Sequence, residues 1–320
     1  MALKYAAGKI RRRMVCGMVA VCTALAGAPA LAAGAKLDGA TIERITGLKG
    51  TYNAEENAFK VSFPRTDVKV SVAGWTMPPF MGLSPWAAFT PHGSGAMVMG
   101  DMALFEDEVN PAMSAALDAG LEVTALHNHF FFDQPKVYFM HIGGVGSVEK
   151  LASGVRAVLD RVSEFRAANP EPAAAFPGGR MPDKSSISAE PLEVILGGKG
   201  QVNNGMFKVV IGRTTQMHGT PVGNEMGVNT WAAFAGSDDN AVVDGDLAML
   251  EHELQPALKS LRREGINIVA IHQHMTGETP RILFLHYWGR GRAQHLAWAL
   301  RRTLDAQGAA AGSSTAGHGR

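Results

Sequence analysis

The sequence predicts an α+β fold of two tandem homologous domains, each a mostly antiparallel sheet with two helices packed on one face. Three observations carry this prediction: an internal repeat, apolar runs that alternate as strands do, and a helical period after those runs. The repeat is clearest where the tetrapeptide Trp-Ala-Ala-Phe that begins at Trp86 recurs at Trp231, 145 residues later. The same offset holds without a gap as far as Leu159 and Leu304. The chain is therefore a tandem duplication.

The duplication also sets the expected domain boundaries. They are a signal peptide at 1–32, a first domain at 37–166, a linker at 167–186, a second domain at 187–305 and a disordered tail at 306–320. The linker is rich in Pro, Gly and Ala, and the tail is of low complexity. Because the two domains are homologous, we expect them to form an intramolecular pseudo-dimer.

Both repeats predict the same order of elements. Extended segments come first, followed by the Trp-Ala-Ala-Phe strand and a second strand. The next helix has apolar residues at a 3.6-residue period and ends at a glycine. A hairpin and a final amphipathic helix complete the unit. The expected ranges are 58–63, 68–73, 96–102, 106–119 and 147–165 in the first repeat, and 206–211, 241–248, 251–264 and 293–304 in the second.

The N-terminus has the pattern of an export signal. Basic residues at 4, 9 and 11–13 precede an apolar run at 14–26, and Ala30-Leu31-Ala32 supplies a cleavage motif. We therefore expect a periplasmic or secreted protein that leaves the cell by the general secretory route. The consecutive arginines keep twin-arginine export open as an alternative, and a retained membrane anchor is the competing interpretation.

The only two cysteines, Cys16 and Cys22, lie inside this expected signal. The residues before Cys22 match the lipobox, the signal for lipid attachment, only weakly. We therefore expect no lipidation of Cys22. Cleavage after Ala32 would remove both thiols, which excludes disulfides and thiolate ligands from the mature chain. A metal ion would then have to be held by histidine, carboxylate or water.

Composition narrows the possible partners. The chain has 320 residues, of which 46% are hydrophobic and 18% charged, with a formal net charge of +1. This length is sufficient for two hydrophobic cores. The near-neutral charge argues against nucleic acid as a partner. After signal cleavage we expect no transmembrane segment.

The predicted hairpin carries three histidines in each repeat. His127 and His129 alternate along a strand, so they point to the same face. The chain turns near Gln134-Pro135 and returns to His141. If the turn centres on Gln134, His141 lies directly opposite His127, with Cβ atoms about 5 Å apart.

The second repeat has the same arrangement in His272, His274 and His286. Three imidazoles that converge on one face can bind a zinc ion at about 2.0–2.1 Å and leave a fourth position for water or substrate. Copper, nickel or iron would accept the same ligands. The alternative is that the histidines stack and hydrogen-bond for structural reasons. Two triads in register favour metal binding.

Acidic residues open the helix before each hairpin: Glu106 and Glu108 in the first repeat, Glu251 and Glu253 in the second. Acids in a first turn complement the helix dipole, by about 0.3–1 kcal/mol each. Alternatively, one of them is a fourth metal ligand or a general base. For Asp101 and Asp246, which follow glycine at a strand end, turn chemistry is the expected role.

Several of these segments together resemble the LppY/LpqO family of exported bacterial proteins, whose domain has no known function. The resemblance rests on the doubled Trp-Ala-Ala-Phe segment, on Val-Met-Gly-Asp-Met-Ala-Leu-Phe-Glu-Asp-Glu-Val-Asn-Pro at 98–111, and on the histidine hairpin through Gly144. It covers nearly all of the expected mature chain. The resemblance implies an exported protein and no established activity or cofactor.

The sequence thus leads to two functional hypotheses. The first is an exported protein that binds a divalent metal, zinc before other ions, through the two histidine triads, with a small molecule as a further partner and hydrolase-like chemistry as an extension. The second is a non-catalytic envelope protein, binding a ligand or a partner, in which the histidine faces pack the interface between the domains. Whether the protein is an enzyme stays open at this point.

Overall fold

The structure, a computed structural model, describes residues 37–315. Both repeats contribute strands to one 12-stranded antiparallel sheet with the order β1-β2-β5-β6-β9-β7-β16-β18-β15-β14-β11-β10. The strands of the first repeat are β1 (Gly50–Asn53), β2 (Ala58–Ser62), β5 (Trp86–His92), β6 (Gly95–Phe105), β7 (Glu122–His127) and β9 (Val137–Gly146). Those of the second are β10 (Gly200–Asn203), β11 (Met206–Gly212), β14 (Asn229–Gly236), β15 (Ala241–Leu250), β16 (Asn267–His272) and β18 (Ile282–Gly291).

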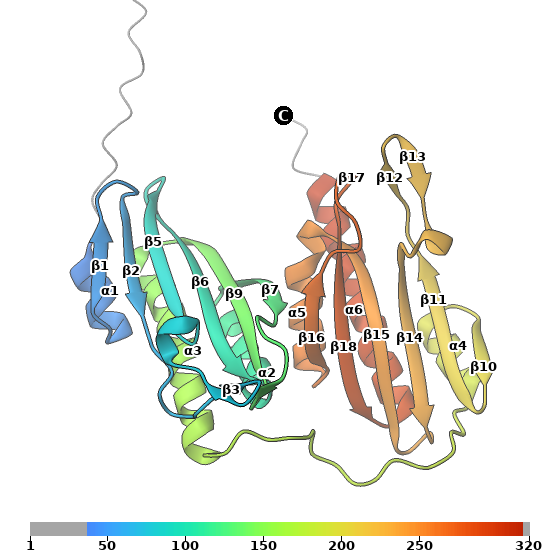
Figure 1. Ribbon diagram of the computed structural model, residues 1–320. Helices are drawn as coiled ribbons and strands as arrows, with labels where there is room; N and C mark the ends of the chain where they lie inside the picture. Colours follow the sequence, from blue (N-terminus) through green and yellow to red (C-terminus); the bar gives the residue numbers. More distant parts are fainter. Residues whose placement is uncertain (1–36, 316–320) are drawn as a thin grey trace, which may run out of the picture. The chain divides into compact units, whose positions relative to one another are not determined.

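In each repeat the helices lie on one face of the strands, as Figure 1 shows. The helices are α1 (Gly39–Thr46), α2 (Glu106–Asp118), α3 (Val148–Ala168), α4 (Ala189–Leu196), α5 (Leu254–Arg263) and α6 (Ala293–Thr315). A short 3₁₀ helix, η3 (Glu251–Glu253), precedes α5. The predicted α+β class is confirmed. Each repeat has one helix more than expected, because α1 and α4 are only eight residues long and too short to show a clear period.

Alternation along the strands explains which face each residue takes. In β5, Ala87 and Phe89 are buried under the helices, and Ala232 and Phe234 repeat this in β14. The intervening side chains face the opposite side of the sheet. The main core therefore lies between the sheet and the helix layer.

Two smaller apolar clusters cover part of the opposite face, one in each repeat. Phe139 belongs to the first cluster and Phe284 to the second. Each lies beside a three-stranded sheet formed by β3 (Ser71–Val72), β4 (Trp75–Thr76) and β8 (Asp133–Gln134), or by β12 (Thr215–Met217), β13 (Thr220–Val222) and β17 (Glu278–Thr279). Two further 3₁₀ helices, η1 (Pro79–Met81) and η2 (Asn224–Met226), follow β4 and β13.

The register of the histidine hairpin differs from the predicted one. His141 pairs with Ala125, and His127 pairs with Phe139, so the predicted direct pairing of His127 with His141 is wrong. The connection is not a tight turn centred on Gln134, because β8 within it pairs with β3 and a bulge interrupts β7. The second repeat shows the same shift, with His286 opposite Ala270.

The two repeats join at the strand pair β7 and β16, where Leu126 lies opposite Ile271. We call this junction the seam. Farther along the two strands, side-chain amides from the helices form the hydrogen bonds to the strand backbones. The Asn110 amide donates to the carbonyl of Ile268 and accepts from its N–H. Gln255, 145 residues after Asn110, does the same for Val123. Each amide thus supplies the donor and the acceptor that a neighbouring strand would have supplied.

The end of the chain also differs from the prediction. A disordered tail was expected from residue 306, whereas α6 continues to Thr315 and buries Gln307. Alanine, which is frequent in this tail, has the highest helix propensity, so low complexity here does not mean disorder. The predicted signal peptide at 1–32 and residues 316–320 lie outside the described residues. No helix within the described range is long and apolar enough to cross a membrane.

Replacing either seam amide should lower the free energy of unfolding. We expect Asn110→Ala and Gln255→Ala each to cost about 1–3 kcal/mol, because each leaves a backbone N–H and C=O at the seam unpaired. Urea denaturation followed by circular dichroism measures the loss. Gln201→Ala, on exposed β10, serves as the control and should stay within about 0.5 kcal/mol of wild type. Equal stability of all three variants would contradict the role of the amides.

Candidate metal centre

Three side chains of the second repeat form the tightest group of potential metal ligands. They are Asp246 from β15, His272 at the end of β16 and His274 two residues later, and one ligand atom from each lies within 4.8 Å of the others. The Nε2 atom of His274 is 3.2 Å from Oδ2 of Asp246, and that of His272 is 4.0 Å from it. Asp246 is almost fully buried, while both histidines are open to solvent on one side.

A hydrogen bond to a backbone carbonyl fixes one ring proton of His274. Its Nδ1 lies 3.1 Å from the carbonyl oxygen of Gly227. Because a carbonyl can only accept, Nδ1 carries a proton, and in the neutral imidazole Nε2 then presents its lone pair to Asp246. A lone pair facing a carboxylate oxygen at 3.2 Å is repulsive unless a cation or a proton lies between them. The arrangement is that of a metal-binding histidine, whose second nitrogen usually donates to such a carbonyl.

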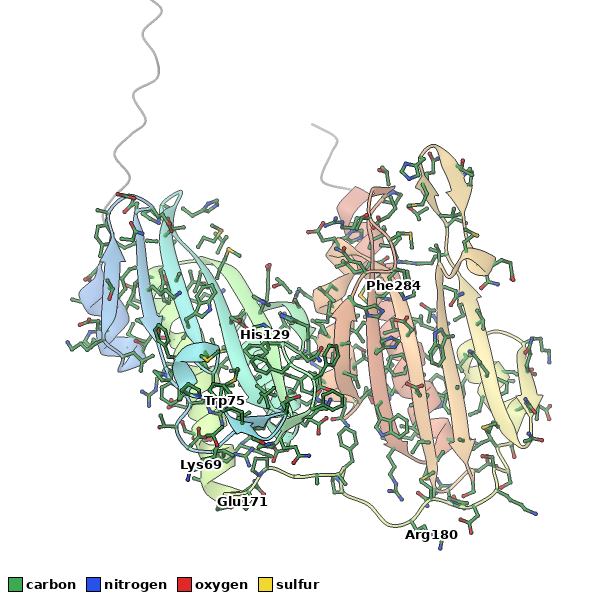
Figure 2. The ribbon with its side chains drawn as sticks, viewed as in Figure 1. Lys69, Trp75, His129, Glu171, Arg180 and Phe284 are labelled. Carbon is green, nitrogen blue, oxygen red and sulfur yellow. The ribbon has the colours of Figure 1, made fainter. Side chains whose placement is uncertain are left out.

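Stacking on a phenylalanine ring holds His274 in the second repeat and His129 in the first. The ring of His274 lies 3.4 Å from that of Phe284 at an angle of 11°, and the ring of His129 lies 3.4 Å from that of Phe139 at 4°. Both phenylalanines are buried in the small clusters. These rings lie on the face of the sheet away from the helices (Figure 2, where His129 and Phe284 are labelled).

The third histidine of the predicted triad stands slightly apart. The ring of His286 stacks on His272, with centroids 4.6 Å apart and an angle of 12°. Its Nδ1 lies 3.2 Å from the carbonyl of Gly245 and therefore donates to it. Nearly parallel stacked rings do not aim their lone pairs at one point, so Asp246 completes the closest set with His272 and His274 while His286 supports it.

The first repeat has the same residues in a looser arrangement. The Nε2 atoms of His127 and His129 are 3.2 Å apart. Two ligands bound to one tetrahedral zinc ion lie about 3.3 Å apart, so this spacing suits a shared ion. Asp101 lies directly opposite His141 in the ladder, with Nε2 and Oδ1 4.0 Å apart. Among the described residues, this buried Oδ1 has no hydrogen-bond partner.

Burial favours the neutral form of three of these imidazoles. Partial desolvation is the main cause that lowers the pKa of His127, His129 and His272; neighbouring histidines lower it further, and Asp101 or Asp246 opposes the shift. A neutral imidazole has a free lone pair at neutral pH, which metal binding requires.

The two aspartates are the site residues that the sequence analysis missed. Turn chemistry was expected for Asp101 and Asp246, yet both lie within long strands, β6 and β15, and each is paired directly with the returning histidine, His141 or His286. The signal was present in the sequence, since the Gly-Asp pair recurs at the repeat offset. Only the pairing of β6 with β9 and of β15 with β18 shows that each aspartate lies beside a histidine.

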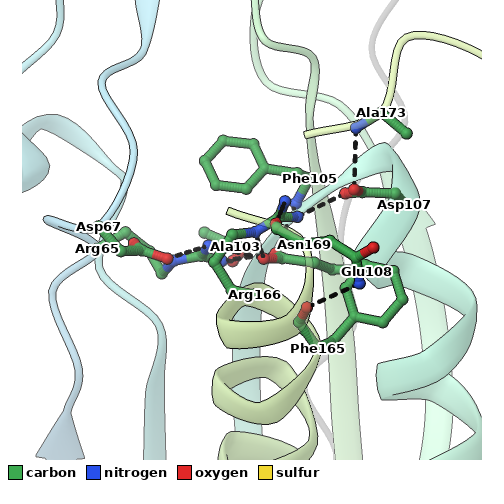
Figure 3. Close-up of polar contacts among 10 residues, drawn as sticks. All are labelled: Arg65, Asp67, Ala103, Phe105, Asp107, Glu108, Phe165, Arg166, Asn169 and Ala173. Carbon is green, nitrogen blue, oxygen red and sulfur yellow. Dashed lines mark hydrogen bonds and ion pairs between the residues drawn. The ribbon is translucent and has the colours of Figure 1, made fainter. Parts of the chain in front are cut away.

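The structure places Glu108 in a different cluster, drawn in Figure 3. Its carboxylate accepts hydrogen bonds from Arg65 at 2.8 and 2.9 Å, from Arg166 at 2.9 Å and from the backbone N–H of Phe105 at 2.9 Å. Asp67 and Asp107 pair with the same two arginines. Glu108 is fully buried and therefore caps α2 and anchors the arginines.

Glu253 occupies the equivalent place in the second repeat. It accepts from Arg213 at 2.5 and 2.8 Å and from the backbone N–H of Leu250 at 2.8 Å. Glu106 and Glu251, at the first position of their helices, are exposed. None of the four has a hydrogen bond or ion pair to a histidine of either cluster within residues 37–315. Their predicted role as a fourth ligand or general base stays a prediction.

Within residues 37–315, no hydrogen bond or ring contact joins the histidines of one repeat to those of the other. The side-chain hydrogen bonds across the seam in the described chain come from Asn110, Gln255 and Arg262, the last of which donates to Ser114. Leu126 and Ile271 face the helices, so the neighbouring His127 and His272 both lie on the open face.

The chain belongs to the family described as a Domain of Unknown Function (DUF1259), which matches residues 40–161 and 190–306. The two matches agree with the duplication. No curated protein matches the chain.

Among solved structures, a trimeric bacterial microcompartment shell protein, PduB, is similar at 9% identity, over 80% of this chain and 89% of that chain, with a TM-score of 0.19. EtuB from Clostridium kluyveri is similar at 11% identity, over 83% and 93% of the two chains, with a TM-score of 0.20. Likeness at these TM-scores carries no argument about fold or function.

Removing the charge of Glu108 should destabilise the protein strongly. We expect Glu108→Gln to lower the free energy of unfolding by about 3–5 kcal/mol, because Arg65 and Arg166 would keep buried charges without their shared partner. Glu106→Gln, two residues earlier and exposed, is the matched control and should change stability by less than about 0.5 kcal/mol. Denaturant unfolding of both variants provides the comparison, and a mild effect of Glu108→Gln would refute the structural role.

Proposed function

We propose that this protein binds a divalent metal ion in each repeat. In the second repeat the ligands are Asp246, His272 and His274, with His286 stacked behind them. In the first repeat they are His127 and His129, with His141 and Asp101 beside them. The observation that carries the proposal is the 3.2 Å approach of His274 Nε2 to the buried carboxylate of Asp246, with Nδ1 of the same ring held by the carbonyl of Gly227.

The donor set supports zinc as the first ion to test. Two imidazoles and one carboxylate are the ligands of several catalytic zinc sites, and they leave a position open for water or an exogenous ligand. Copper, nickel and iron accept the same donors. Calcium and magnesium prefer oxygen ligands, whereas two of the three donors here are imidazole nitrogens.

Hydrolysis of a small molecule is the catalytic extension of this proposal. The partial exposure of the histidines supports access by a ligand. The carboxylates of Glu108 and Glu253 accept hydrogen bonds from arginines and backbone N–H groups, which favours the exposed Glu106 and Glu251 as the general base. Metal binding is therefore the function that the geometry supports best.

The second part of the proposal is that the protein is exported from the cytoplasm. The basic, apolar and small-residue regions at 1–32 support a periplasmic or secreted location. The resemblance of the repeat motifs to the LppY/LpqO family of exported proteins supports the same location. In an oxidising compartment, sites built from histidine and carboxylate have no thiol to lose by oxidation.

Metal stoichiometry tests the proposal directly. The protein from Ala33 onward, stripped with chelator and dialysed against zinc, should bind close to two ions per chain by elemental analysis. His272→Ala/His274→Ala should remove one, and His127→Ala/His129→Ala the other. Asp246→Asn should weaken the second-repeat site by at least about tenfold, the scale on which even residues behind the ligands act.

His92→Ala, an exposed histidine outside both clusters, is the control and should leave two ions bound. Failure of the wild-type protein to bind zinc, copper or nickel in stoichiometric amount would sink the proposal. Equal binding by wild type and both double variants would do the same.

Metal-dependent stability separates ligands from packing residues. Free zinc at a hundred times its dissociation constant should add about 2.7 kcal/mol per site to the free energy of unfolding. His272→Ala/His274→Ala should lose one such increment in zinc and change little in chelator, because both side chains are partly exposed. A loss of equal size in zinc and in chelator, measured by thermal unfolding, would instead make the histidines structural.

A further inference from the structure

A basic groove lies on the helix layer, on the side of the sheet away from the histidines. It runs between α2 and α5 and has about 340 Å³ of empty space. Its lining residues are Ser114, Leu117, Asp118, Lys259, Arg262 and Arg263. The first three belong to one repeat and the last three to the other.

These six residues are three equivalent pairs. Lys259, Arg262 and Arg263 each follow their first-repeat counterpart by the repeat offset of 145, so the groove presents the same three helix positions twice. In α2 those positions hold no cation. In α5 all three are cationic. The groove therefore has three positive charges and one carboxylate, that of Asp118.

The three cations have no ion-pair partner in the described part of the chain. Within residues 37–315, Lys259, Arg262 and Arg263 form no ion pair. By contrast, Arg302 on α6 pairs with Glu264. Asp118 is exposed and beyond ion-pair distance, so it does not neutralise the groove.

Two hydrogen bonds within the protein fix the guanidinium group of Arg262. Its Nε donates to the hydroxyl of Ser114 at 3.2 Å and its Nη1 to the carbonyl of Ile266 at 2.6 Å. Its Nη2 group donates to no acceptor in the described part of the chain. Burial lowers the pKa of Arg262 to about 10, and a bound anion would oppose that shift.

We propose that this groove is an oxyanion site that binds a phosphate group, with Arg262 as the fixed anchor and Lys259 and Arg263 as flexible partners. The free Nη2 donors of a planar guanidinium and a nearby ammonium suit the oxygens of a tetrahedral anion. The site is independent of the proposed metal centre, which lies across the sheet.

The phosphate belongs to a larger molecule. Lys259 and Arg263 also line a second groove of about 1020 Å³, which includes Ser260 and the ion pair of Glu264 with Arg302. A phosphate ester bound at Arg262 can therefore extend its remaining groups along α5. A soluble phosphate ester and a phospholipid headgroup share this chemistry, and the test below distinguishes them.

Calorimetric titration with inorganic phosphate, in chelator and at constant ionic strength, tests the site on the metal-free protein from Ala33 onward. Lys259→Gln/Arg263→Gln should weaken binding at least about tenfold, the equivalent of one charge-assisted hydrogen bond. Neither residue is fully buried, so the variant should fold. Asp118→Asn should bind phosphate more tightly, because it removes the only carboxylate in the groove.

Lys69→Gln/Lys136→Gln removes the same charge from exposed positions of the first repeat and is the matched control. Its affinity for phosphate should equal that of wild type. Wild-type binding no stronger than that of the Lys259→Gln/Arg263→Gln variant would overturn the proposal, as would an equal loss in the control.

Vesicles identify the source of the phosphate. Sedimentation with vesicles of phosphatidylglycerol, but not of phosphatidylcholine, and its loss in Lys259→Gln/Arg263→Gln would assign a phospholipid headgroup. Phosphate binding without sedimentation would assign a soluble phosphate ester. Sedimentation that is unchanged in the variant would contradict a role of the groove in lipid binding.

Discussion

The seam between β7 and β16 is the constraint on which the rest of the structure depends. One backbone pair, Leu126 with Ile271, joins the two halves of the sheet, and the amides of Asn110 and Gln255 pair the buried groups beside it. Buried N–H and C=O groups must find partners, so neither amide can be lost without cost. Because Leu126 and Ile271 face the helices, the next residue on each strand must face the other side. The seam thereby puts both histidine clusters on one face.

Duplication explains both the symmetry of this arrangement and its limits. The positions that hold the seam have the same role in both repeats, as Asn110 and Gln255 show. One helical turn later the equivalent positions diverge, from Ser114 to Lys259, and the groove becomes basic on one side only. The rims of the histidine clusters diverge as well. Phe131 and Phe132 are highly exposed beside His129, where the second repeat has threonine and glycine.

The sequence was sufficient for what depends on periodicity and insufficient for what depends on register. The repeat, the fold class and the convergence of His127 with His129 follow from spacing alone. The pairing of His141 does not, because the connection contains β8, which pairs with the distant β3. Glu108 could not be assigned either, since its partner Arg65 lies 43 residues away and Arg166 lies 58 residues away.

The same limit explains why the carboxylate of the candidate site went unnoticed. A Gly-Asp pair in a strand is compatible with a turn, a surface or a ligand, and only the neighbour across the ladder decides between them. Asp246 lies opposite His286 and is almost fully buried. Its Oδ1 accepts a hydrogen bond from the N–H of Leu285, and its Oδ2 lies 3.2 Å from Nε2 of His274. Burying an anion is costly unless a positive charge compensates it. Arginine fills that role for Glu108 and Glu253. No arginine or lysine forms an ion pair with Asp246 within the described residues, so the compensating charge has to come from the adjacent imidazoles or, as we propose, from a bound metal ion.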